Sequence, residues 1–317
     1  MKQIGSLLIL LLFLSSNLYS QILEEIEVQI ASRNKLKTKV RYDHKYTNGK
    51  PSQKGIKTSL TTYHKSGNIL EVNYLNAKGV VTSSEKYDYD KSGNRILYER
   101  VGSSKYRKVS KYNSANQLIR ESGFNGTEEF RTDYEYNAAG RIGVISNIQG
   151  GRVLKKMVYK YIGNIANVSV YSMGSTLSAK LKMMYDLRSN LVEEITLDVN
   201  GNEIEKKEYT YNNASQLLEE TKTTQGKLYY RITYDYDSSG RLLTVSEERP
   251  SRKKYIKKKY SYDNQGNLTS YQWRRKPGEE FNKKTYTYNS AGVCLTEHTI
   301  YPATQYELLS KFEYTYY

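Results

Sequence analysis

Tyrosines alternate with polar residues at regular intervals, and this alternation is the strongest pattern along the chain. In Tyr234-Asp235-Tyr236 two tyrosines lie two residues apart, which is the period of a β-strand and not of a helix. We take the second tyrosine as the marker of each copy. Markers follow one another at intervals of 23 to 26 residues: Tyr63, Tyr89, Tyr112, Tyr136, Tyr161, Tyr185, Tyr211, Tyr236, Tyr262 and Tyr288. A period of this size is typical of proteins whose repeats bury surface mainly against their neighbours.

Each repeat is predicted to hold two strands and two turns. After the marker come Asp or Asn, two small or polar residues and usually Gly, as in residues 237–240. The Asx side chain can close a type I turn, and the glycine can take the left-handed position of a bulged hairpin. An aliphatic residue such as Leu242 is then expected opposite the marker Tyr236. Three copies lack the glycine and are expected to have looser turns, at Asn116, Ser189 and Ser215.

The repeats predict an all-β fold of tandem hairpins of about 25 residues each. Because two turns per repeat make a continuous antiparallel meander, we expect residues 57–317 to form one elongated, twisted sheet of about twenty strands. The unbroken phase of the markers favours a single array over the two domains that the length would suggest.

The segment Tyr236-Asp237-Ser238-Ser239-Gly240-Arg241-Leu242 resembles the Tyr-Asp-x-x-Gly-Arg-Leu signature of the YD repeats, which are found in Rhs-type bacterial exported proteins and in teneurins. Residues 137–142 and 263–268 are near matches, and a weaker resemblance covers about residues 57–317. The resemblance implies a spiralling antiparallel sheet, sometimes a shell around a toxin, and in some members carbohydrate or cell-surface binding. About ten repeats are expected to be too few for a closed shell.

The first 20 residues have the pattern of a secretory signal peptide. Lys2 precedes an apolar run at residues 7–14, and the small residue Ser20 ends the segment. The mature chain is expected to start at Gln21 and to be exported to the periplasm, the cell surface or the medium. No later stretch approaches the roughly 18 apolar residues of a membrane helix, so no membrane span is expected in the mature chain.

Residues 21–56 lack the repeat. Ile22, Leu23, Ile26 and Ile30 lie at helical spacing. We expect this segment to be a cap that covers the open edge of the first repeat, as a short helix or as irregular strands.

The composition fits an exported β-protein. The chain has 33 Tyr against 5 Phe and 1 Trp, so amphipathic rings are expected to fill the pleats. The single cysteine, Cys294, excludes an intramolecular disulfide. It takes the place that Leu242 and Leu268 have in other copies, which indicates a packing role.

Nothing in the sequence favours enzymatic chemistry, so we expect a non-enzymatic protein with no catalytic residue, no metal and no cofactor. The three histidines lie in different repeats or in the cap, without metal-ligand spacing: His44, His64 and His298. Residues 88–93 with Glu99 imitate the spacing of a calcium loop, but they are also the hairpin turn of a repeat. An outer-membrane barrel is disfavoured because strands such as residues 205–210 offer no lipid face.

The candidate site is a row of basic residues. It lies five residues before the marker, from the copy of Tyr112 onward and with Tyr316 counted as the last marker, whereas the copy of Tyr89 has Ser84 there: Arg107, Arg131, Lys156, Lys180, Lys206, Arg231, Lys257, Lys283 and Lys311. The odd offset places this basic ladder on the face opposite the tyrosines, at intervals of roughly 10 Å. It is either a solvated face that discourages aggregation, partly neutralised by acids such as Glu194, Glu220 and Glu297, or a track that attracts an acidic polymer.

Two functions remain open. The protein is a binding or adhesion module, for which export and a net charge of +16 favour an acidic polysaccharide or another envelope component over nucleic acid. Alternatively it is a spacer or an assembly component that associates with itself through the last strand. The edge of that strand at residues 312–317 is expected to be exposed.

Overall fold

The computed structural model describes residues 26–317, so the expected signal peptide at residues 1–20 and the start of the cap lie outside the described residues. The chain folds into two compact units. Of the described residues, unit 1 comprises 26–133, Tyr286–His298 and Glu307–Tyr317, and unit 2 comprises Tyr134–Thr285 and Thr299–Tyr306.

Unit 1 begins with helical residues 26–33. Its strands follow in chain order: β1 (Leu36–Thr47), β2 (Lys50–Pro51), β3 (Ile56–Tyr63), β4 (Ile69–Leu75), β5 (Val81–Tyr89), β6 (Arg95–Val101), β7 (Tyr106–Tyr112), β8 (Leu118–Phe124) and most of β9 (Glu129–Tyr136). The short β2 pairs only with the end of β1. From β3 to β9 each strand pairs antiparallel with the next one along the chain, as the hairpin repeats predict.

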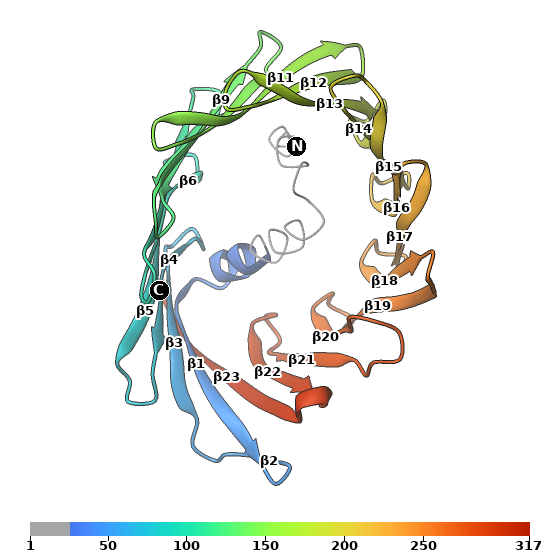
Figure 1. Ribbon diagram of the computed structural model, residues 1–317. Coiled ribbons are helices and arrows are strands. Elements are labelled where there is room, and N and C mark those ends of the chain that lie inside the picture. Colours follow the sequence, from blue (N-terminus) through green and yellow to red (C-terminus); the bar gives the residue numbers. More distant parts are fainter. Residues whose placement is uncertain (1–25) are drawn as a thin grey trace. The chain divides into compact units, whose positions relative to one another are not determined.

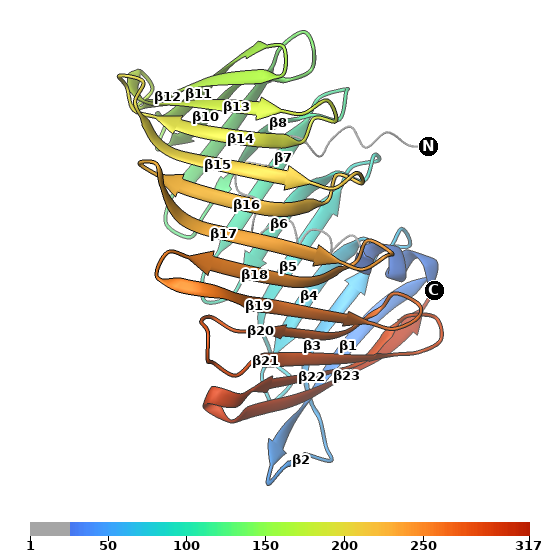
Figure 2. The same ribbon diagram turned by 90° about the vertical axis from the view of Figure 1, so that its right-hand side faces the viewer.

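Unit 2 continues the same pattern, and Figure 2 shows its strands β12 to β20 lying one beside the next. Its strands are β10 (Ile142–Gln149), β11 (Arg152–Ile162), β12 (Ile165–Ser172), β13 (Thr176–Tyr185), β14 (Leu191–Leu197), β15 (Glu203–Tyr211), β16 (Leu217–Thr224), β17 (Lys227–Tyr236), β18 (Leu242–Arg249), β19 (Arg252–Tyr262), β20 (Leu268–Trp273) and the first part of β21 (Asn282–Tyr288). The last elements are β22 (Cys294–Tyr301), the 3-10 turn η3 (Pro302–Thr304) and β23 (Tyr306–Tyr316). The two strands have residues in both units, and η3 lies in unit 2.

The first and last strands of the array are joined, which corrects the predicted open meander. Within unit 1, β1 pairs antiparallel with β3 on one side and with β23 on the other, from Leu36 opposite Tyr316 to Lys45 opposite Leu308. The all-β prediction is confirmed, but the sheet is closed and not an open, elongated one. Closure gives hydrogen-bond partners to the two edge strands that an open array would expose.

The hairpin turns form as predicted. In the Asp237 turn the backbone N–H of Gly240 donates to the Asp237 carbonyl at 2.9 Å, and the Asp237 carboxylate accepts from the N–H groups of Ser239 and Arg241. Gly240 has φ +78°, in the left-handed region. Ser215, without the freedom of glycine, takes φ +59° and keeps the same backbone bond at 3.0 Å. The turns at Asn116 and Ser189 are closed in the same way, so the expectation of looser turns was wrong.

Marker tyrosines pair as predicted, with Tyr236 opposite Leu242, and their hydroxyl groups explain why tyrosine is used and not phenylalanine. Several of these hydroxyls donate to the carbonyl that begins the return strand of the preceding repeat, as from Tyr236 to Leu217 at 2.9 Å, from Tyr211 to Leu191 at 2.8 Å and from Tyr262 to Leu242 at 3.0 Å. The ring therefore fills the pleat while its hydroxyl satisfies a backbone acceptor. We call the face that holds these rings the tyrosine face.

The cap is part helix and part strand, and in unit 1 its helix packs on the tyrosine face beside β1 and β3 (Figure 1). Tyr63 is fully buried there and donates a hydrogen bond of 2.7 Å to Glu27, which also pairs with Lys39 at 2.9 Å. A Cβ added at Gly67 would lie 2.2 Å from the Val28 carbonyl oxygen. The helix thus approaches the first hairpin as closely as glycine allows, while β1 covers the edge of β3.

Candidate functional site

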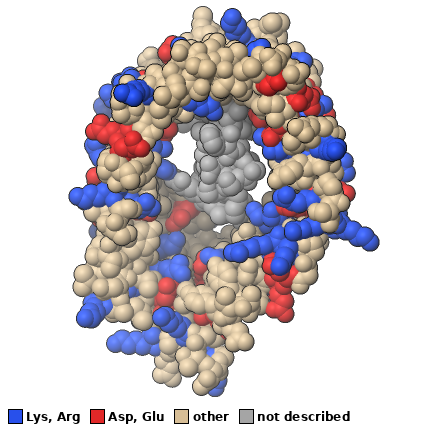
Figure 3. Space-filling model, in the orientation of Figure 1, with Lys and Arg blue, Asp and Glu red and all other residues tan. Residues whose placement is uncertain are grey.

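Positive charge is concentrated in residues 252–284 of unit 2, which contain β19, β20 and β21. Eleven Lys and Arg residues stand against three Asp and Glu residues, a net charge of +8 out of +16 for the chain. Figure 3 shows Lys and Arg gathered over the part of the surface where β18 and β19 lie. The basic residues are Arg252, Lys253, Lys254, Lys257, Lys258, Lys259, Arg274, Arg275, Lys276, Lys283 and Lys284.

On the tyrosine face of these strands, lysines are interleaved with aromatic rings. The register aligns two rows of side chains: Lys258, Trp273 and Asn282 in one, and Tyr260, Tyr271 and Lys284 in the next. The ring centroids of Tyr271 lie 5.1 Å from Tyr260 and 4.8 Å from Trp273. Since cross-strand neighbours share a face, both cations lie directly beside the rings.

The opposite face of the same strands is cationic as well. Lys259, Gln272 and Lys283 form one row across β19, β20 and β21. The Lys259 Nζ lies 4.9 Å from the centroid of the Phe281 ring, a cation–π distance. Lys283 belongs to the predicted basic ladder, whereas the other two members of this row, Lys259 and Gln272, do not.

Lys258, Lys259 and Lys283 form no ion pair with any carboxylate in the described part of the chain. Burial lowers the pKa of Lys258, and the adjacent charge of Lys257 adds to this effect. A half-buried cation without a counter-charge is costly to the fold. A bound anion would supply that counter-charge.

Other members of the basic ladder are neutralised by neighbouring acids. The Lys206 Nζ lies 2.9 Å from both Glu193 and Glu208, whose hydrogen bonds raise the pKa of Lys206. Arg231 lies 3.3 Å from Glu219 and 3.5 Å from a second acid, Glu248. Arg131 likewise lies 3.0 Å from Asp133. The ladder is therefore not a continuous track of unpaired cations.

A bulge removes Lys257 from the predicted face. In the register Val245 pairs with Lys258 while Ser246 pairs with Ile256, so Lys257 is the extra residue. Its Nζ reaches Glu247 on the tyrosine face at 2.6 Å. The constant sequence offset concealed this, because one inserted residue reverses the alternation of a strand.

The acids expected to neutralise the ladder lie on the wrong face for that role. Glu194 and Glu220 are buried on the tyrosine face, where Glu194 pairs with Lys207 at 3.1 Å and Glu220 accepts a hydrogen bond of 2.5 Å from Tyr230. Glu297 lies 4.0 Å from Arg41. The ladder cations Arg131, Lys206 and Arg231 pair instead with other acids, which the sequence offsets did not identify: Asp133, Glu193, Glu208, Glu219 and Glu248.

The remaining ladder residues are scattered between the units. Arg107 in unit 1 and Lys156 in unit 2 are without an ion pair among residues 26–317, and the Lys180 Nζ donates to the Val199 carbonyl at 3.0 Å. For the last copy Tyr314, and not Tyr316, donates to the preceding repeat, at the Cys294 carbonyl. Counted from Tyr314, Lys311 is three residues before the marker, so it does not continue the ladder.

The sequence missed two members of the cationic strands, Trp273 and Lys284. The runs at residues 257–259 and 274–276 were visible as basic charge, but only the register shows that Lys258 and Lys284 flank aromatic rings. The alternation Tyr271-Gln272-Trp273 was the available signal for an aromatic face on β20.

Groups that could support other chemistry have structural partners. Burial raises the pKa of the Cys294 thiol to about 11, so this thiol is protonated at neutral pH. The carboxylate of Asp90, in the segment that imitates a calcium loop, accepts the N–H groups of Ser92 and Asn94 in its own turn. Among the described residues no group of three His, Cys, Asp or Glu side chains is arranged to hold a metal ion. Residues 26–317 contain no helix with the length and apolar character needed to cross a membrane.

Comparisons with known proteins found only distant structural likeness. No family model matches the chain, and no curated protein matches it. The crystal structure of a TcdB2–TccC3–Cdc42 complex is 15% identical over 82% of this chain, with a TM-score of 0.35, and this chain spans 15% of its length. A porin-like protein from Bacteroides uniformis is 13% identical over 74% of this chain and 97% of its own, also with a TM-score of 0.35. A porin-like protein from Bacteroides vulgatus is 10% identical, with coverages of 88% and 98% and a TM-score of 0.23. Likeness at this level does not bear on function.

Proposed function

We propose that the protein is an exported, non-enzymatic binding module that holds an acidic polysaccharide on strands β19 to β21. The observation that supports this is the contrast in charge compensation within unit 2. Lys206 and Arg231 are tied to carboxylates, whereas Lys258, Lys259 and Lys283 form no ion pair with a described carboxylate.

The arrangement suits a ligand that is both anionic and ring-shaped. Lys258 and Lys284 supply positive charge beside Tyr260, Tyr271 and Trp273, and aromatic rings offer amphipathic contact surface. Export is inferred from the signal-peptide pattern of residues 1–20, and it favours an acidic glycan of the cell envelope over nucleic acid.

The alternative function relied on an exposed last strand. Because β23 pairs with β1 over residues 308–316, the edge expected at residues 312–317 is occupied. Self-association through that edge is therefore not proposed.

The test is binding of residues 21–317 to polygalacturonate, measured by calorimetry at two salt concentrations. Binding is expected at 20 mM salt and should weaken at 300 mM, because exposed charges are screened over about 8 Å at physiological ionic strength. Replacing Lys258, Lys259, Lys283 and Lys284 together by Gln should reduce the affinity at least tenfold. Neutral dextran should not bind.

A matched control removes the same charge elsewhere. Lys54, Lys78, Lys91 and Lys105 are exposed residues of unit 1, and their replacement by Gln should leave most of the binding intact. Equal losses in both quadruple variants would show attraction by net charge alone and would contradict a site on β19 to β21.

A further inference from the structure

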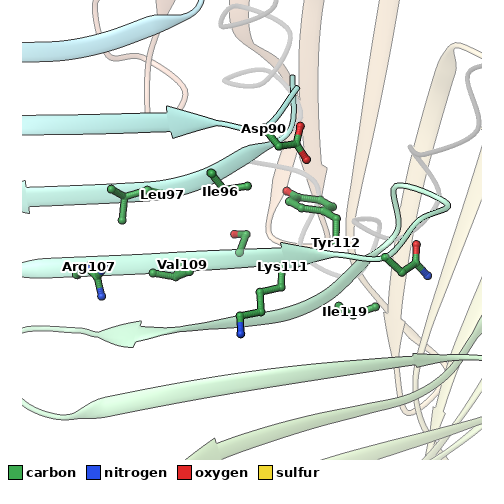
Figure 4. Close-up of a pocket in the computed structure, with 10 residues that line it drawn as sticks. Asp90, Ile96, Leu97, Arg107, Val109, Lys111, Tyr112 and Ile119 are labelled. Carbon is green, nitrogen blue, oxygen red and sulfur yellow. The ribbon is translucent and has the colours of Figure 1, made fainter. Parts of the chain in front are cut away.

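A pocket of about 530 Å³ lies between successive hairpins of unit 1, far along the sequence from the cationic strands. Figure 4 shows its lining residues, which come from β6, β7, the start of β8 and the adjoining turns. The apolar part consists of Leu97 and Val109, which are cross-strand partners, with Ile96 and Ile119 from the return strands. Arg107 also lines the pocket.

Because side chains alternate between the two faces along β7, a cation lies at each end of the apolar part of the pocket. Arg107, Val109 and Lys111 are two residues apart and so share the face opposite the tyrosines. The two basic residues lie about 13 Å apart along the strand. Neither forms an ion pair within residues 26–317, although Glu99 stands opposite Arg107 in the register. The pocket therefore combines apolar surface with uncompensated positive charge.

A second pocket, of about 390 Å³, occupies the equivalent place in unit 2. Its Asp186, Val192, Tyr211 and Asn212 correspond to Asp90, Ile96, Tyr112 and Asn113 of the first pocket. The lining of the second pocket stops at the turn end of the strands, whereas that of the first extends along β6 and β7.

The difference lies in two side chains that neighbour the cation of each repeat. Where the first pocket has the pair Leu97 and Val109, unit 2 has the cross-strand pair Glu193 and Glu208. These acids bind Lys206, which occupies the position of Arg107, at 2.9 Å each. In unit 1 the same positions are apolar, and the cation is left available for a ligand.

We propose that the unit 1 pocket binds a small amphipathic anion. The acidic group lies at Arg107, and an acyl or aryl body covers Leu97 and Val109. The pocket volume is in the range of small-molecule sites. Arg107 can bind a carboxylate or sulfonate with two parallel hydrogen bonds, and Lys111 adds positive potential at the other end.

The probe is 8-anilinonaphthalene-1-sulfonate, with decanoate as competitor and decanol as the uncharged comparison. The full chain should bind the probe saturably with a rise in fluorescence, and decanoate should displace it more effectively than decanol. Arg107→Gln should weaken binding about tenfold. Lys156→Gln is the matched control, because it removes an equivalent ladder cation that lines neither pocket.

The most direct test exchanges the apolar pair of the unit 1 pocket with the acidic pair of unit 2. Leu97→Glu with Val109→Glu reproduces the arrangement around Lys206 and should abolish binding of the probe with the strand dichroism unchanged. The reverse exchange, Glu193→Leu with Glu208→Val, should create a second site of similar affinity. Undiminished binding in the first double variant, or no added site in the second, would overturn the proposal. The Lys258, Lys259, Lys283 and Lys284 variant should bind the probe like the parent, so failure of this site and of the polysaccharide site can be distinguished.

Discussion

Lys207 in β15 and Lys258 in β19 occupy the same position of two repeats, four residues before the markers Tyr211 and Tyr262. Both lie on the tyrosine face and are partly buried. Burial disfavours the charged form of Lys207, but the carboxylates of Glu194 and Glu205 outweigh it and raise the pKa. For Lys258, burial and the charge of Lys257 both lower the pKa.

The two lysines show that one repeat position serves two purposes. Lys207 belongs to a closed network with Glu194 at 3.1 Å and Glu205 at 3.7 Å, so its charge is used within the fold. The cross-strand neighbours of Lys258 are Val245 and Trp273, and no carboxylate among residues 26–317 forms an ion pair with it. A periodic charge in the sequence is therefore not evidence of a periodic binding surface.

The two lysines can be compared only at a pH at which the protein stays folded, and ionisation of buried tyrosines sets the upper limit of that range. Of the changes predicted here, this one should have the largest effect on stability. Burial raises the pKa of Tyr185 and of Tyr211 to about 12, while unfolded tyrosine titrates near 10. The folded state holds these protons more tightly, so their contribution to stability is present below pH 10 and is lost as the pH rises to 12. We expect cooperative unfolding in that window, with tyrosinate absorbance and loss of strand dichroism in one step. Gradual ionisation near pH 10 without unfolding would contradict it.

Removing Glu194, the closest carboxylate to Lys207, should destabilise the fold. Glu194 is 8% exposed, and Glu194→Ala leaves a partly buried cation without its closest carboxylate. We expect a loss of about 2 to 4 kcal/mol in the free energy of unfolding, measured in urea. Glu194→Met combined with Lys207→Met replaces the pair by apolar volume and should recover to within about 1 kcal/mol of the parent. A single variant as stable as the parent would show that the pair is not structural.

Substituting the lysines themselves should give changes of opposite sign. Lys207→Met destabilises by leaving Glu194 without its cation, whereas Lys258→Met is expected to stabilise by about 1 kcal/mol at pH 7. The folded pKa of Lys258 lies below its unfolded value near 10.5. The parent therefore gains stability as the pH rises toward 10, and the advantage of Lys258→Met should shrink. Urea unfolding at pH 7 and pH 9.5 measures both; destabilisation by both variants would contradict the contrast.

Substitutions in the hairpin turns of the two repeats should change the stability least. The β15 hairpin has Ser215 at φ +59°, and the β19 hairpin has Gly266 at φ +89°. Ser215→Gly should stabilise the protein by about 0.5 to 1 kcal/mol because glycine adopts this conformation without steric cost. Gly266→Ser should have the opposite effect of similar size. Thermal midpoints compare the two, and a lower midpoint for Ser215→Gly would show that the unfolded state gains more freedom than the turn loses strain.

The sequence by itself determined the strands, the turns and their phase. Tyr234 and Tyr236 define a strand face, and Asp237 and Gly240 define the turn, because each of these interactions lies within one repeat. For the site, the sequence predicted basic residues on the face opposite the tyrosines, and Arg231 and Lys283 lie there. It could not show which cations would be compensated, because that depends on neighbouring strands.

Only the tertiary structure decided the closure and the site. The pairing of β1 with β23 joins segments about 270 residues apart, and Leu36 and Tyr316 have no local pattern that specifies a partner at that distance. The bulge at Lys257 and the pairing of Lys206 with Glu193 and Glu208 depend on register between strands. A shift of one residue moves a side chain to the other face, so a charge at a constant offset becomes a structural ion pair in one repeat and an available cation in another.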